Sequence, residues 1–204
     1  MEADGAARAK EHVERALSAE RLEYTERAKR SQKLEELKRR FFALHESDDR
    51  QGAGRELQRI LSGLFELHGL NPKEAFRVVG EEIDGSFELD HEVYLVEAKW
   101  TADPIPESPL LVFREKVEGK SKYTRGVFVS INGISDQARD AITRGKQPNF
   151  FVIDGFDITM LLEDNIDLCR LLRERQRLLA DKGAVVVPFK DVFGDKEPTI
   201  APPE

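Results

Sequence analysis

The sequence lacks the features that define several large classes of protein. Its single cysteine, Cys169, excludes an intramolecular disulfide and a cysteine-rich zinc site, and it is typical of the reducing cytoplasm, where we expect the protein to act. No apolar run approaches the roughly 18 residues needed to cross a bilayer. The first residues also lack the apolar segment of a signal peptide, so we expect neither membrane insertion nor export.

Basic residues are not in excess either, because the formal net charge is −7. This charge argues against a protein that coats nucleic acid without specificity. The acidic surplus is uneven, however: residues 47–100 carry a net charge of −6, whereas residues 101–150 carry +2. The total therefore does not exclude DNA as a partner. It predicts DNA binding that is weak without a divalent cation and sensitive to salt.

Residues 5–46 are rich in Ala, Glu, Arg, Lys and Leu and contain no proline, which predicts a long helix. Leu34, Leu37, Phe41 and Leu44 follow the 3-4-3 spacing of a coiled-coil seam, but the seam does not continue towards the N-terminus. Two interpretations stay open. The helix is either a solvated element that packs its end on the domain, or an arm that binds a partner helix or a second copy of the chain.

The rest of the chain alternates strand and helix patterns. We expect a helical extension over 1–46, a globular domain over 47–190 and a flexible tail over 191–204, with Ser47–Asp49, Gly52 and Gly54 ending the first helix. The expected elements are a helix to about 69, strands at 76–83, 87–89 and 93–100, a helix at 110–118, a strand at 126–131, a helix at 135–143 capped by Ser135, a strand at 150–153, helices at 158–162 and 166–179, and a last strand at 185–187. This order predicts an α/β or α+β fold with a central mixed sheet flanked by helices.

Charged residues interrupt an otherwise apolar strand at Glu97 and Lys99. Side chains alternate along a strand, so these two share one face, whereas Val96, Ala98 and Trp100 share the other. A two-residue loop at 90–91 pairs Leu89 with Glu92. The same register then places Asp84 directly opposite Glu97.

Opposed carboxylates destabilise a sheet unless one is protonated or a cation lies between them. Oxygen ligands on fixed strands suit Mg²⁺ or Mn²⁺, with Asp84 and Glu97 as the metal ligands. Lys99 would then orient the attacking water, help to deprotonate it, or stabilise charge on a phosphate. The competing interpretation is an amphipathic edge strand with solvated Glu97 and Lys99.

Other candidates surround this core. Glu56, near the start of the second helix, could face the sheet and contact the metal, although it could equally be a solvated residue favoured there by the helix dipole. A basic patch follows the Glu-x-Lys strand and could contact DNA phosphates, or could simply be a solvated surface. Its residues are Lys116, Lys120, Lys122 and Arg125.

The motifs Gly54-Arg55-Glu56-Leu57, Glu82-Ile83-Asp84-Gly85 and Tyr94-Leu95-Val96-Glu97-Ala98-Lys99, followed by Gly126-Val127-Phe128-Val129, resemble the PD-(D/E)xK nuclease superfamily, and more closely the Mrr-like restriction endonuclease catalytic domain. The resemblance covers about residues 50–165. It implies a restriction-endonuclease-like core, metal binding by Asp84 and Glu97, action of Lys99 on the attacking water, and a looser match of Glu56 to the family's helix acid.

The main hypothesis is therefore an Mg²⁺- or Mn²⁺-dependent endonuclease that hydrolyses DNA, with restriction or defence against foreign DNA implied by the resemblance. The alternative is a silent or partner-dependent nuclease-fold module that acts in binding or assembly. In either case the N-terminal helix could make the chain a homo-oligomer, such as a dimer, or join it to a partner protein.

Overall fold

The computed structural model describes residues 2–78, 81–144 and 147–194, and the predicted tail segment 195–204 lies outside the described residues. The chain divides into two units, Met1–Glu36 and Leu37–Glu204. The expected long helix is confirmed as α1 (Glu2–His45), which fills the described part of the first unit and extends into the second. No helix in the described segments is long and apolar enough to cross a membrane.

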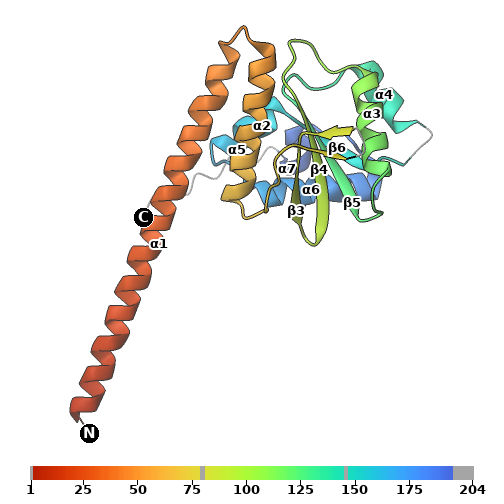
Figure 1. The fold of residues 1–204 in the computed structure, drawn as a ribbon. Coiled ribbons are helices and arrows are strands. Elements are labelled where there is room, and N and C mark those ends of the chain that lie inside the picture. Colours follow the sequence, from red (N-terminus) through yellow and green to blue (C-terminus); the bar gives the residue numbers. More distant parts are fainter. Residues whose placement is uncertain (1, 79–80, 145–146, 195–204) are drawn as a thin grey trace. The chain divides into compact units, whose positions relative to one another are not determined.

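A four-stranded mixed sheet forms the centre of the second unit, as predicted (Figure 1). Its order is β3 (Gly85–Leu89), β4 (Glu92–Lys99), β5 (Thr124–Ser130) and β6 (Phe150–Asp154). The first two strands are antiparallel and the others parallel. Asp90 and His91 join β3 to β4 with φ angles of 50° and 68°, which two-residue turns of type I′ require. The predicted pairing of Leu89 with Glu92 is confirmed.

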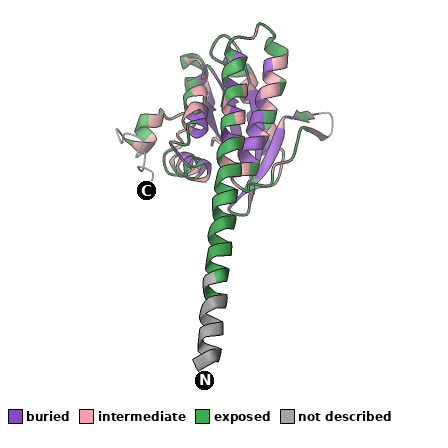
Figure 2. Cartoon of the chain, turned by 90° about the vertical axis from the view of Figure 1, so that its left-hand side faces the viewer, coloured by how far each residue is buried: buried purple, intermediate pink, exposed green. Residues whose placement is uncertain are grey.

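Helices cover both faces of this sheet. On one face α2 (Arg50–Leu67) packs Phe65 on Phe87 with ring centroids 4.5 Å apart. On the other face α3 (Glu107–Glu118) packs Phe113 on Phe128 at 5.5 Å. The remaining helices are α4 (Asp136–Thr143), α5 (Gly155–Leu162), α6 (Leu168–Lys182) and α7 (Phe189–Phe193). In Figure 2 the strands are buried, whereas helices around them show one buried and one exposed side.

The predicted strand at 76–83 is wrong as a single element. The chain forms β1 (Phe76–Val78) and β2 (Glu81–Ile83), which pair antiparallel with each other and place Phe76 opposite Ile83. Val79 and Gly80, between the two strands, lie outside the described residues.

The predicted helix break is confirmed at 46–49, but Gly52 and Gly54 are not part of it, because they lie inside α2. Asp49 is the N-cap of α2 and accepts a hydrogen bond from the Gly52 N–H at 2.9 Å. A Cβ at Gly52 would collide with the Asp49 carboxylate, so this glycine permits the cap rather than ending a helix.

The predicted strand at 185–187 does not form. One ladder-like bond joins the Val152 N–H to the Val185 carbonyl at 2.9 Å. The Val187 carbonyl instead accepts a hydrogen bond from Arg175, and Pro188 then begins α7. The helix predicted at 135–143 is confirmed as α4, with the Ser135 side chain accepting from the Ala138 N–H.

A buried ion pair links α5 to α6. Two oxygens of Asp157 lie 2.7 and 2.8 Å from Nη2 of Arg175, and the two side chains are 1% and 2% exposed. Asp157 also completes a capping box with Asp154 at the start of α5. The pair therefore fixes the packing of the helices that follow β6.

Replacing Arg175 with methionine leaves a buried carboxylate without its cation, so we expect Arg175→Met to lower the free energy of unfolding by about 3–5 kcal/mol. Arg177→Met is the matched control, because Arg177 is 74% exposed and pairs only with Asp181 at 3.6 Å. The control should change stability by no more than about 0.5 kcal/mol. Urea unfolding followed by circular dichroism measures both, and equal losses in the two variants would contradict the structural role.

Candidate active site

Asp84 directly precedes β3 and continues its register. Gly85 pairs with Val96, so Asp84 takes the next position, opposite Glu97. Its Oδ2 accepts a hydrogen bond from the Ala98 N–H at 2.9 Å. Burial, with the charge of Glu97 adding to it, raises the pKa of Asp84 against the opposing effects of the Ala98 N–H and Lys99. Asp84 therefore lies opposite Glu97 in the sheet, and its carboxyl group interacts electrostatically with both Glu97 and Lys99.

Glu97 is a buried carboxylate held by two lysines. Its Oε1 lies 2.7 Å from Nζ of Lys99, and its Oε2 lies 2.8 Å from Nζ of Lys116. Burial alone would lower the pKa of Lys99, but Glu97 and then Asp84 outweigh burial and raise it. Lys99 is consequently an ammonium group beside both carboxylates.

Lys116 reaches this cluster from α3. Its Nζ donates to Glu97 and also to the backbone carbonyl of Glu82 at 2.9 Å, and its side chain is only 14% exposed. The sequence suggested a DNA contact for Lys116, and the structure instead joins it to the carboxylates. One signal could have revealed this position: Lys116 lies three residues after buried Phe113 and next to buried Val117, which places it near the sheet-facing side of α3.

Two other members of the predicted basic patch have partners outside the cluster. Arg125 pairs with Glu92 at 3.1 Å, and Nζ of Lys122 lies 5.0 Å from the centroid of the Tyr123 ring. Arg125 is opposite Tyr94, three residues before the position opposite Glu97. That offset is about 10 Å along the sheet. Lys122 and Arg125 therefore lie towards the other end of β5.

Glu56, the looser candidate of the sequence analysis, forms ion pairs with two arginines, and its role at the metal stays a prediction. Its carboxylate binds Arg40 at 2.6 Å and Arg59 at 3.1 Å, and both arginines lower its pKa against the opposing effect of burial. Gln58 is the α2 residue that contacts Asp84, through a side-chain hydrogen bond. Residues two positions apart on a helix point about 200° away from each other. Because Gln58 faces Asp84, Glu56 faces the opposite side of α2.

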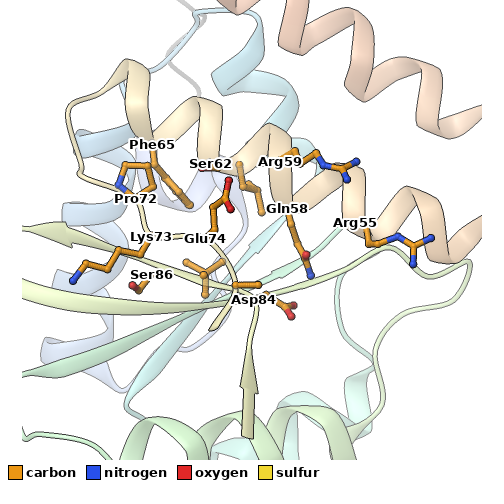
Figure 3. Close-up of a pocket in the computed structure, with 14 residues that line it drawn as sticks. Arg55, Gln58, Arg59, Ser62, Phe65, Pro72, Lys73, Glu74, Asp84 and Ser86 are labelled. Carbon is orange, nitrogen blue, oxygen red and sulfur yellow. The ribbon is translucent and has the colours of Figure 1, made fainter. Parts of the chain in front are cut away.

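Gln58 carried a signal that sequence reasoning missed. Gln58, Leu61, Ser62 and Phe65 follow the i, i+3, i+4, i+7 spacing of one helix face, so Gln58 is a polar residue on a sheet-facing stripe. All four line a pocket of about 230 Å³ beside Asp84, and Figure 3 shows Gln58 extending from α2 towards Asp84. Arg55, Arg59 and Lys73 also line this pocket, together with the two acidic residues Glu74 and Asp84.

Two carboxylates and a lysine thus meet on one face of a mixed α/β sheet. The model of a family described as restriction endonuclease (Mrr_cat) matches residues 50–162, which is more than half of the chain, and the chain belongs to this family. Asp84, Glu97 and Lys99 all lie within the matched region.

No curated protein matches the chain. Among solved structures, the chain is similar to one titled as the crystal structure of a protein of unknown function, AF1548. The identity is 21%, the TM-score is 0.46, and the match covers 59% of this chain and 76% of the other.

The donor set of Asp84 and Glu97 fits a hard divalent cation. Both offer carboxylate oxygens from fixed backbone positions, and the raised pKa of Asp84 has the unfavourable charge of Glu97 among its causes. A cation between them would relieve that repulsion. Lys116 and Lys99 now hold both oxygens of Glu97, so a metal ion competes with these ammonium groups for the same atoms.

Because of this competition, removing the Lys116 ammonium should strengthen metal binding. We expect Lys116→Met to lower the dissociation constant for Mn²⁺ roughly tenfold, equivalent to about 1.4 kcal/mol. Titration calorimetry, or the electron paramagnetic resonance signal of free Mn²⁺, measures this constant without any substrate.

Two variants give the controls. Glu56→Gln should leave Mn²⁺ affinity unchanged because Glu56 is bound to Arg40 and Arg59, whereas Asp84→Asn should weaken it by removing a ligand. Unchanged or weaker Mn²⁺ binding in Lys116→Met would show that Lys116 does not compete with metal.

Proposed function

We propose that this protein is a metal-dependent endonuclease that hydrolyses phosphodiester bonds of DNA, in restriction or another defence against foreign DNA in the cytoplasm. The observation that carries the proposal is the cluster of Asp84, Glu97 and Lys99, with Lys99 Nζ 2.7 Å from Glu97 on a buried strand. Membership of the restriction endonuclease family supports it. Two opposed, partly buried carboxylates destabilise a sheet, and such a cost is typical of a functional site rather than of an inert domain.

Asp84 and Glu97 would hold Mg²⁺ or Mn²⁺. When bound, such a cation supplies a water of lowered pKa and neutralises charge on the scissile phosphate. Lys99 contributes an ammonium group, because its carboxylate neighbours raise its pKa above the ordinary value in spite of burial. It is therefore better suited to orienting water and stabilising the developing phosphate charge than to accepting a proton. Gln58 and the Ala98 N–H fix the orientation of Asp84.

The DNA backbone would approach at Asp84, which belongs to the cluster and also lines the pocket beside α2. Arg55, Arg59 and Lys73 line that pocket beside Asp84 and can contact phosphates on either side of the cleaved bond. The basic residues Lys120, Lys122 and Arg125 stay candidates for phosphates farther along the duplex. These contacts would compensate locally for the net charge of −7 on the whole chain.

Purified protein should nick or linearise plasmid DNA in Mg²⁺ or Mn²⁺ and not in chelator. We expect Asp84→Asn and Lys99→Met each to lower the cleavage rate by at least about a hundredfold, because each removes a group that acts on the metal or the phosphate. Gel electrophoresis of supercoiled plasmid over time measures the rate.

Glu88→Gln and Lys182→Met are the matched controls, since both residues are exposed and lie outside the cluster. They should cleave at the wild-type rate. Cleavage that persists in Asp84→Asn and Lys99→Met at wild-type rates would reject these residues as the site, and circular dichroism of all four variants excludes unfolding as the cause.

The alternative, a domain that acts in binding or assembly, has one observation in its favour. The first unit exposes Leu17, Leu22 and Tyr24, which are 51%, 64% and 76% exposed. Exposed apolar side chains on a helix suit contact with a second helix. We therefore also propose that α1 associates with a second copy of the chain.

Light scattering on the full chain and on the triple variant Leu17→Ser, Leu22→Ser, Tyr24→Ser tests this association. The full chain should have the mass of an oligomer, and the variant that of a monomer. Equal masses for the two proteins would remove α1 as the association surface. Deletion to residue 47 is a poor substitute, because Leu37, Phe41 and Leu44 are buried parts of the second unit.

A further inference from the structure

Three potential metal ligands of different chemistry meet where α2 ends and α6 begins. His68 is the C-cap of α2, Asp167 is the N-cap of α6, and Cys169 lies in the first turn of α6. One ligand atom from each lies within 4.8 Å of the others. Nearly 100 residues separate His68 from the other two, so the fold, rather than local sequence, brings them together.

The geometry is close to that of a bound ion. His68 Nδ1 lies 3.1 Å from Asp167 Oδ2, and Cys169 Sγ lies 3.9 Å from the His68 carbonyl oxygen. Two protein ligands of a tetrahedral zinc ion are roughly 3.3–3.8 Å apart, as zinc–ligand bonds of about 2.0–2.3 Å require. The His68 and Asp167 atoms are therefore almost at this spacing, and small side-chain rotations would bring in Cys169.

The cluster is buried on the side of His68 and open to solvent on the side of Asp167. The His68 side chain is 6% exposed and thus fixed in place, whereas that of Asp167 is 56% exposed. The Asp167 carboxylate both caps α6 and contacts His68. Its Oδ1 accepts a hydrogen bond from the Arg170 N–H, while its Oδ2 faces His68. A water molecule can complete the coordination from the solvent side.

We propose that His68, Asp167 and Cys169 form a metal site for zinc or a similar borderline-soft divalent cation, which ties the end of α2 to the start of α6. Nitrogen and sulfur donors select such ions over Mg²⁺. Binding takes His68 as neutral imidazole through Nδ1 and Asp167 as carboxylate, and it releases the thiol proton of Cys169 to water.

This site is separate from the Asp84–Glu97 cluster. His68 follows Gln58 by ten residues, about 15 Å along the helix. Asp167 and Cys169 lie beyond residue 162, where the restriction endonuclease match ends. The ion would therefore join the part of the chain that carries Gln58 to helices outside the matched domain, and the proposal does not depend on nuclease activity.

Cobalt is a suitable probe, because a Co²⁺–thiolate bond absorbs in the near ultraviolet and the chain has one cysteine. The full-length protein, stripped with chelator, is titrated with Co²⁺ in excess Mg²⁺, which occupies the carboxylate cluster. We expect a thiolate absorption that saturates at one Co²⁺ per chain and disappears when Zn²⁺ is added.

Asp167→Asn is the decisive variant, because asparagine preserves the N-cap and removes the anionic ligand. It should weaken Co²⁺ binding at least tenfold, as should His68→Gln. Asp49→Asn makes the same change at the N-cap of α2 and should bind Co²⁺ like the wild type, as should Asp84→Asn.

Two results would overturn the proposal. One is the absence of thiolate absorption in the wild type at saturating Co²⁺. The other is wild-type affinity in Asp167→Asn, which would reveal a cysteine that binds cobalt alone. If His68→Gln does not fold, Asp167→Asn decides the outcome by itself.

Discussion

The register of the β3–β4 hairpin determines which side chains meet in the candidate active site. Asp90 and His91 adopt left-handed backbone angles, so the loop has two residues and Leu89 must pair with Glu92. Five residues further, this pairing brings Asp84 to Glu97. A slip of one residue would turn Glu97 to the face of α2. Arg173 reinforces the turn from α6 by binding both oxygens of Asp90 at 2.8 Å.

Much of this arrangement could be predicted from the sequence because it depends on local rules. Strand alternation placed Glu97 with Lys99, and the length of the turn fixed the position of Asp84. The helix residue was different. Glu56 and Gln58 flank Leu57, at the two edges of the apolar stripe of α2. Which of these two residues faces Asp84 depends on the angle at which α2 crosses the sheet. A single sequence does not contain that crossing angle.

Lys116 illustrates a second limit of the sequence. Its charge suggested a surface contact with DNA, yet its partners come from β4 and from the backbone of Glu82. Such a bond depends on how closely α3 packs on the sheet. Gly126 permits that approach, because a Cβ there would lie 2.8 Å from both Phe113 and Val117 of α3. A missing side chain on β5 thus lets α3 lie close enough for Lys116 to reach Glu97.

The electrostatics of the cluster follow from these placements. Asp84 and Glu97 contribute two negative charges, and Lys99 and Lys116 return two positive ones, so the cluster is near neutral within an acidic segment. A divalent cation held by Glu97 would compete with one or both ammonium groups, whose positive charge would then be unpaired beside the site. That charge favours a phosphate as the next ligand. Metal and a polyanionic substrate would therefore bind with positive coupling. The metal would neutralise the carboxylates that repel a phosphate, and the phosphate would neutralise the ammonium groups that repel the metal.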